Sequence, residues 1–246
     1  MIRTEHPTGF RILWKRTKYS ACQTRQFTFL LPLTPAPGIE LESRLEESIA
    51  GKGRRVLQFF KGQLLRWKKE VRTVLADLER QPEDVDLSLA LILVMMAFFK
   101  DREDSIFLLA DVTTPQADVG TQLSLPNTPR IILLGDSILA SRKWMLAMEG
   151  KLVIEATHLQ LDFTCALAVL FAAYYVFNME YEGEAATTLE FIQRFLVRIN
   201  PENSKCTSRF HVSKRSGKTV QRKTMALNPH VASFIRDFTD YDWKNH

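Results

Sequence analysis

The sequence predicts an α+β fold that is predominantly helical, with a small sheet and a basic C-terminal β-hairpin. Apolar residues that recur at steps of three and four over several long segments indicate helices. Three short apolar runs, 106–109, 131–134 and 152–154, have the length of buried strands. With 246 residues, of which 46% are hydrophobic, the chain can bury the core of one domain or of two small ones.

The N-terminal segment, residues 1–38, is predicted to be a disordered basic tail with a proline-rich linker. Its first thirty residues carry six Lys or Arg residues against Glu5 alone. The linker contains Pro32, Pro35, Pro37 and Gly38, which interrupt regular structure. The same charge balance is typical of a mitochondrial presequence, which stays an alternative.

Residues 39–246 are expected to form a single globular α+β domain. It would comprise a basic helical part (39–80), a core (83–200), and a basic hairpin with a terminal helix (204–243). Three widely spaced cysteines without a CxxC pair favour a reducing compartment, and therefore an intracellular protein of the cytoplasm or nucleus. They are Cys22, Cys165 and Cys206.

Charge is distributed unevenly along the chain. The formal net charge of +5 combines +8 over residues 1–80, −10 over residues 81–190 and +7 over residues 191–246. The basic ends are expected either to fold against the acidic middle or to present two basic surfaces to an external polyanion.

Two helices are predicted before the first strand. Residues 53–80 are expected to form one long helix, and residues 83–99 a second one after Pro82. The apolar stripe of the first helix is Val56, Phe60, Leu64, Trp67, Val71, Val74 and Leu78. Its other faces are basic. A basic amphipathic helix can bind a membrane surface or a calmodulin-like groove, but packing against the acidic middle is the favoured interpretation.

A loop and an apolar helix are predicted in the middle of the chain. The loop covers about 112–129, and the helix covers 161–179. The stretch from Phe163 to Met179 reaches the lower limit of length for a membrane span. Its flanks are acidic and lack the Lys or Arg residues that orient a span. We therefore expect a buried core helix and no membrane span.

Two further helices are predicted near the C-terminus. Thr187 and Glu190 have the spacing of a capping box, which predicts a helix start, and Asn200-Pro201 predicts its end. The apolar stripe between them is Leu189, Ile192, Phe195, Leu196 and Ile199. Asn228 and Pro229 predict the N-cap and first residue of the last helix. Its apolar face is Val231, Phe234, Ile235 and Phe238.

A basic β-hairpin is predicted between these helices. Residues 204–224 carry seven Lys or Arg side chains and no acid. Apolar residues that alternate with polar ones, and Gly217 at a tight turn, predict that 208–214 pairs with 218–224. Such charge attracts phosphate, anionic lipid or an acidic protein. A solvated edge hairpin, protected by its lysines from pairing with another chain, is the alternative. The candidate binding residues are Lys214, Arg215, Lys218, Arg222 and Lys223.

One motif is similar to a hydrolase motif. Residues 130–139 resemble the nucleophile block of GDSL-type serine hydrolases, and the resemblance implies Ser137 as the nucleophile. The family's late Asp-x-x-His has no match, because Asp242 and His246 are one residue too far apart. A serine without a positioned base is a weak nucleophile, so a turn after a buried strand is the favoured interpretation.

Two other motifs lack their partners. Gly217-Lys218-Thr219 is similar to the end of a P-loop, but Val212 stands where that loop needs another glycine. Cys206 and His211 supply only half of the ligands of a zinc site. We therefore predict no catalytic residue, no metal and no cofactor.

Several C-terminal segments carry a family resemblance. They are Ala172–Asn178, Thr188–Phe195, Ser216–Lys223 and Asn228–Trp243. They resemble the C-terminal region of uncharacterised fish proteins described as sterile alpha motif domain-containing protein 3-like, over about residues 85–243. The resemblance implies no activity and no catalytic residue. Full-length members can carry an N-terminal sterile alpha motif, a small helical interaction domain, which residues 1–80 do not contain.

The function that the sequence favours is that of an intracellular, non-enzymatic interaction protein with contacts through its basic C-terminal surface. Its partner would be an acidic protein. The alternatives are a nucleic-acid-associated module and a GDSL-like serine hydrolase.

Overall fold

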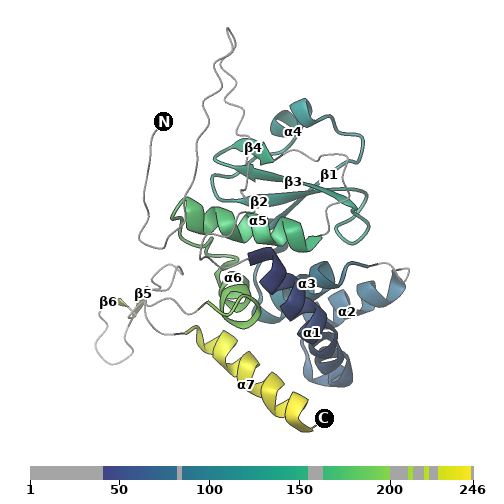
Figure 1. The fold of residues 1–246 in the computed structure, drawn as a ribbon, viewed down its shortest axis with the longest axis vertical. Coiled ribbons are helices and arrows are strands. Elements are labelled where there is room, and N and C mark those ends of the chain that lie inside the picture. Colours follow the sequence, from purple (N-terminus) through teal and green to yellow (C-terminus); the bar gives the residue numbers. More distant parts are fainter. Residues whose placement is uncertain are drawn as a thin grey trace.

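The computed structural model describes residues 41–81, 85–154, 163–199 and 227–244, together with the backbone alone of 210–212 and 219–221. The fold is α+β and predominantly helical, which confirms the predicted class. A four-stranded sheet lies at one end of the molecule and a layer of helices at the other (Figure 1). The tail and linker predicted over residues 1–38 lie outside the described residues.

The sheet has the spatial order β1-β2-β3-β4. Its strands are β1 (Phe107–Ala110), β2 (Arg130–Leu134), β3 (Lys143–Met148) and β4 (Lys151–Ile154). β1 pairs with β2 in parallel, and the other neighbours are antiparallel. The three predicted strands are confirmed. Sequence reasoning missed β3, although Trp144–Met148 is an apolar run of the same kind as the one that predicted β2.

Helices cover both faces of the sheet (Figure 1). The segment predicted as a loop over 112–129 contains α4 (Gln116–Gln122), whose Val119 packs on Ile132 and Leu134 in a small separate core. On the opposite face, α5 (Phe163–Val176) packs against β2 and β3. Because side chains alternate along a strand, Ile131 and Leu133 face this second side and belong to the main core.

α5 lies within the predicted apolar helix, 161–179, and is buried on nearly all sides. This agrees with the expectation of a core helix. In the parts of the chain that the structure describes, no helix has the length and apolar character needed to cross a membrane.

The predicted single helix over 53–80 is wrong. Two helices, α1 (Leu41–Gly62) and α2 (Lys69–Arg80), cover this region, and a 3₁₀ turn (Leu64–Arg66) separates them. α2 packs against α3 (Leu87–Phe99). Trp67 stabilises this corner. Its indole Nε1 donates to the carbonyl oxygen of Phe60 at 2.7 Å, and its ring centroid lies 5.7 Å from that of Phe98. Both helices face the same core, so the apolar periodicity continues through the corner and did not reveal it.

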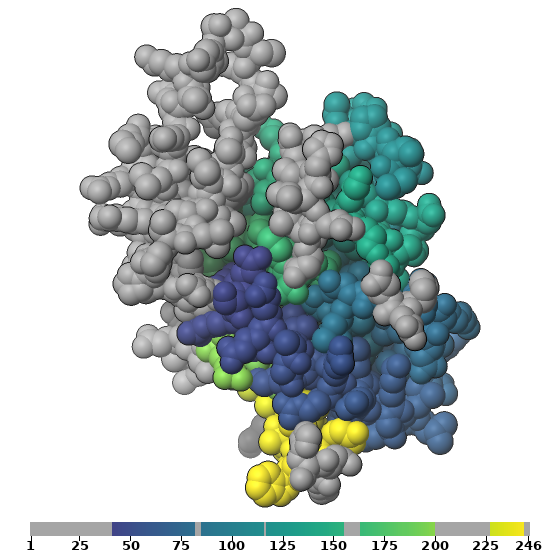
Figure 2. Space-filling model, turned by 45° about the vertical axis from the view of Figure 1, so that its right-hand side comes forward, coloured from purple at the N-terminus to yellow at the C-terminus, as the bar shows by residue number. Residues whose placement is uncertain are grey.

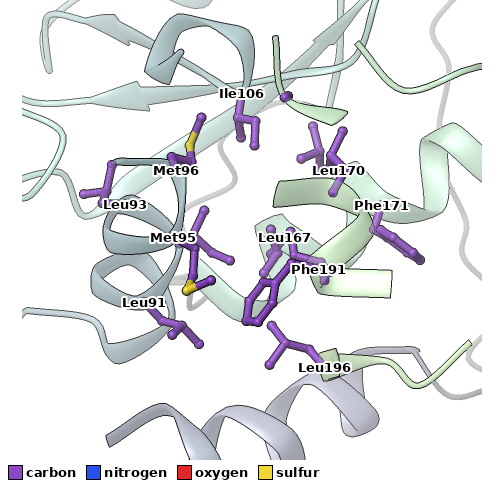
Figure 3. Close-up of a cluster of buried hydrophobic side chains, with 14 of the residues drawn as sticks. Leu91, Leu93, Met95, Met96, Ile106, Leu167, Leu170, Phe171, Phe191 and Leu196 are labelled. Atoms are coloured by element: carbon purple, nitrogen blue, oxygen red, sulfur yellow. The ribbon is translucent and has the colours of Figure 1, made fainter. Parts of the chain in front are cut away.

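α3 is the central helix of the molecule. Every residue from Ser88 to Met96 is buried. The Asp86 carboxylate caps its N-terminus by accepting hydrogen bonds from the backbone N–H of Ser88 and Leu89, at 2.8 and 3.1 Å. Figure 3 shows side chains of α3 meeting those of α5 and of the segment 191–196 in the core. The predicted helix over 83–99 is therefore confirmed from Leu87 onward.

The predicted capping box at Thr187 and Glu190 is wrong. α6 (Ala186–Phe191) begins at Ala186 and continues as a π-helix (Ile192–Leu196), so both residues lie buried inside the helix. The carboxylate of Asp101, which follows α3, accepts a hydrogen bond from the backbone N–H of Thr188 at 2.7 Å instead. A cap supplied from so far along the chain leaves no local sequence pattern.

The terminal helix is confirmed as α7 (Pro229–Lys244). Asn228 is its N-cap, because its Oδ1 accepts a hydrogen bond from the backbone N–H of His230 at 2.9 Å. The buried ring of Phe234 lies among aromatic rings from the other helices. The centroid distances are 5.4 Å to Phe191, 5.8 Å to Phe98 and 6.0 Å to Phe60.

We predict that Phe234→Ala lowers the free energy of unfolding by about 3–5 kcal/mol, since it opens a cavity between four helices. Urea denaturation measures the change. Trp243→Ala on the same helix is the control, because this side chain is 86% exposed and its removal should cost less than about 0.5 kcal/mol. Equal midpoints for the two variants would contradict the central role of Phe234.

Candidate functional site

The segment between the π-helix and α7 contains the predicted hairpin. β5 (Phe210–Val212) pairs antiparallel with β6 (Thr219–Gln221), in a sheet of its own. The ladder is offset by one residue from the predicted pairing of 208–214 with 218–224, since Phe210 faces Gln221. The five candidate residues, Lys214, Arg215, Lys218, Arg222 and Lys223, lie outside the described residues. Residues 200–226 are called the hairpin segment below.

The two ends of the hairpin segment meet the same helix. Just after the segment's C-terminal end, the backbone N–H of Asn228 donates a hydrogen bond to Glu190 Oε1 at 3.3 Å, and the side-chain amide of Asn228 donates one to Thr187 Oγ1 at 3.4 Å. Just before its N-terminal end, Gln193 Nε2 donates to the carbonyl oxygen of Ile199 at 3.5 Å. Glu190 and Gln193 are three residues apart and are therefore neighbours on one helical face. We call Thr187, Glu190, Gln193 and Asn228 the anchor.

Side chains of α1 also bind the chain before the N-terminal end of the hairpin segment. The carbonyl oxygens of Phe195, Leu196 and Val197 accept hydrogen bonds from Lys52 Nζ, Ser48 Oγ and Arg44 Nη1, at 3.4, 2.6 and 3.4 Å. These carbonyls lie at the C-terminal end of a helix, where further backbone N–H groups of the helix are lacking as donors. Side chains of α1 supply the donors instead. Two of the three donors are cations, the charge that a helix C-terminus favours.

Glu190 of the anchor forms a buried ion pair with the neighbouring Arg194. Arg194 Nε donates to Glu190 Oε1 at 2.9 Å, and the Glu190 side chain is 2% exposed. Tyr181 Oη donates to Gln193 Oε1 at 2.9 Å, also in buried surroundings. Nearby, burial lowers the pKa of Lys52, and repulsion from Arg198 and Arg55 lowers it further. A buried pair keeps its partners in place, because removal of one member leaves the other charge uncompensated.

One described ion pair, Arg194 with Glu190, joins a basic end of the chain to the acidic middle, and the other described pairs lie within the ends or within the middle. Arg55 pairs with Asp242 at 2.8 Å and Arg66 with Asp237 at 3.1 Å, and both pairs link α1 or its corner to α7. Within the middle, Arg130 pairs with Glu182 at 3.3 Å. The described helices of both ends also pack against the middle, α1 and α2 against α3 and α7 against α6, which agrees with the first expectation for the charge distribution.

Ser137 follows β2, as the similarity to GDSL hydrolases requires, but its hydroxyl serves a turn. Ser137 Oγ accepts a hydrogen bond from the backbone N–H of Ala140 at 3.2 Å, and its carbonyl oxygen accepts one from Ser141 Oγ at 2.8 Å. His230 is the one histidine whose side chain the structure describes. It lies at the start of α7, in the helical layer, whereas Ser137 lies at the sheet (Figure 1).

The remaining motifs gain no support from the described residues. Thr219 begins β6, whereas a P-loop would have to lead into a helix at this point. Cys206 and the side chain of His211 lie outside the described residues. Among the residues that are described, no group of His, Cys, Asp or Glu could hold a metal ion.

A second buried polar centre lies around Arg130 and braces the fold. Its guanidinium donates to the carbonyl oxygen of Asp104 at 3.0 Å and to Thr128 Oγ1 at 2.6 Å, beside the pair with Glu182. Burial raises the pKa of the neighbouring Tyr174 to about 12. The strand, the loop after α5 and the turn before β1 are thereby joined.

Sequence reasoning missed the anchor. It placed Thr187 and Glu190 at a helix start, although a charged residue between the apolar Leu189 and Phe191 is itself a signal of a buried, paired carboxylate. No model of a known protein family, no curated protein and no solved structure matches the chain.

We predict that a fluorophosphonate probe does not label Ser137, because no described base is placed to activate its hydroxyl. Mass spectrometry of the probe-treated protein measures labelling, with Ser137→Ala as the control. Labelling that disappears in this variant would contradict the assignment of Ser137 to a turn.

We predict that Asn228→Ala loosens the anchor locally and lowers the free energy of unfolding by about 1 kcal/mol, the usual effect of losing an N-cap. Asp86→Ala removes the equivalent cap of α3 and is the matched control. Hydrogen exchange of peptides spanning 227–234 should rise more in Asn228→Ala than in Asp86→Ala at equal stability. Equal exchange in both variants would show that Asn228 does not hold this end of the hairpin segment.

Proposed function

We propose that the protein is a non-enzymatic, intracellular interaction protein, which binds an acidic partner protein through the hairpin segment. The observation that carries the proposal is the anchor. Both ends of a segment with seven positive charges and no acid over 204–224 are held on one buried helical face.

Fixed ends favour binding in two ways. They limit the conformations of the segment before a partner arrives, which reduces the entropy lost on association. They also keep like charges together, and a concentrated positive potential steers acidic partners toward the surface.

The test uses a polyglutamate peptide as a model of an acidic protein surface. We predict that Lys214→Gln, Arg215→Gln and Lys218→Gln together weaken peptide binding at least tenfold at physiological salt, since each cation contributes to a screened attraction of roughly 0.5 kcal/mol or more. Fluorescence anisotropy measures the dissociation constant. The urea midpoint of this variant should equal that of the unchanged protein, because the proposal gives these cations a role in binding alone.

A charge-matched control removes three cations elsewhere. Arg54→Gln, Lys143→Gln and Lys151→Gln change exposed residues that form no ion pair among the described residues. This variant should bind the peptide like the unchanged protein. Equal loss in both variants would reduce the effect to net charge and contradict the proposal. If the hairpin variant unfolds, the three cations stabilise the fold, and this result would also contradict the proposal.

The nucleic-acid alternative gives a different result in the same assay. A duplex bound through four or five phosphates would show a log–log salt slope near −4, since each neutralised phosphate contributes about −0.9. Such a slope, with duplex binding tighter than peptide binding, would replace the acidic protein by nucleic acid as the partner.

A further inference from the structure

The corner between α1 and α2 exposes two adjacent leucines. Leu64 is 44% exposed and Leu65 is 94% exposed, and both lie in the 3₁₀ turn that Trp67 holds in place. Single exposed leucines are common on protein surfaces. Here, however, the pair lies at the tip of a fixed corner, and the nearest charged side chains along the chain are cations.

Four cations at the start of α2, or next to it at the end of α3, have no acidic hydrogen-bond or ion-pair partner among the described residues. They are Lys68, Lys69, Arg72 and Lys100. Other cations of the same helices do have partners, as Lys61 has Glu79 and Arg80 has Asp77. The exposed Glu70 is the acid in this first turn of α2, so the group of cations keeps a positive excess.

The cations form a surface rather than a scattered set. Lys69 and Arg72 lie three residues apart on one face of α2 and line a shallow hollow of about 270 Å³, together with Thr73, Ala76 and the ion pair of Asp77 with Arg80. Lys68 and Lys100 approach each other where α2 begins and α3 ends. The pKa of Lys68 is lowered, because the Lys100 ammonium can donate a hydrogen bond to the uncharged Lys68 amine and because the two groups repel each other when both are charged. An anion near both ammonium groups would relieve this repulsion.

We propose that this corner docks the protein on an anionic membrane surface. The leucines enter the boundary between headgroups and acyl chains, and Lys68, Lys69, Arg72 and Lys100 contact lipid phosphates. The combination of exposed apolar side chains with flanking cations is the chemistry of interfacial membrane binding. In Figure 2, α1 and α2 lie at the surface of the lower half of the molecule, beside α7.

Other occupants fit the corner less well. A phosphate ion or a nucleic acid would use the cations but gain nothing from Leu65. A second copy of the chain would bring like charges together, and two leucines are far from the roughly 800 Å² per partner that a stable interface buries.

Sedimentation with vesicles tests the proposal, with phosphatidylcholine alone and mixed with phosphatidylserine. The full chain should bind only the mixed vesicles. Lys68→Gln, Lys69→Gln and Arg72→Gln together should weaken binding about a hundredfold, as each cation near an anionic surface contributes about fivefold. Leu64→Ser with Leu65→Ser should weaken it at least about tenfold. The control variant Arg54→Gln, Lys143→Gln, Lys151→Gln should bind within a few-fold of the unchanged protein.

The outcomes separate the occupants. Vesicle binding that survives the leucine variant would make the corner a plain phosphate-binding patch and overturn the proposal. The proposal would also be overturned if the unchanged protein self-associates and the leucine variant does not, because a second copy of the chain would then cover the corner. Both corner variants should keep the urea midpoint of the unchanged protein and its binding of polyglutamate. The membrane proposal and the proposed function can therefore fail independently.

Discussion

The contact between α7 and the other helices holds the helical layer together. Phe234 faces aromatic rings from α1, α3 and α6, and Phe59 of α1 faces Phe238 and Tyr241 at 5.9 and 5.1 Å between ring centroids. Such edge-to-face pairs add about 0.5–1.5 kcal/mol each beyond the burial of apolar area. The last described helix of the chain is therefore a part of its core, and the hairpin segment is an insertion between two core elements.

Buried and half-buried polar groups specify how the elements join. Asp101 caps α6 from the end of α3, Glu190 holds the start of α7, and Arg130 links the sheet to the loop after α5. Each of these groups has its partner on another element, so it constrains the arrangement of the elements rather than one of them. A buried charge is costly unless it is paired, and that cost disfavours alternative packings.

Local patterns in the sequence predicted the elements whose signals are local. Asn228-Pro229 marked the start of α7, and the short apolar runs marked three of the four main strands. The failures share a physical cause. The Trp67 indole bonds back to the carbonyl oxygen of Phe60, and the cap of α6 comes from Asp101. Each of these features depends on a contact that a single stretch of sequence does not contain. The anchor was missed for the same reason.

The order of the core elements along the chain has a consequence for synthesis. The apolar face of α1, with Phe59 and Phe60, is completed by rings that lie about 175 residues later along the chain, at Phe234 and Phe238. At the usual rate of about 5–20 residues per second, α1 leaves the ribosome roughly ten seconds or more before its packing partner. During this interval the nascent chain exposes an aromatic surface, and exposed surfaces of this kind make incomplete chains prone to aggregation. A stop codon before α7 would therefore also leave the aromatic face of α1 exposed, because the rings of α7 that pack against it would be missing.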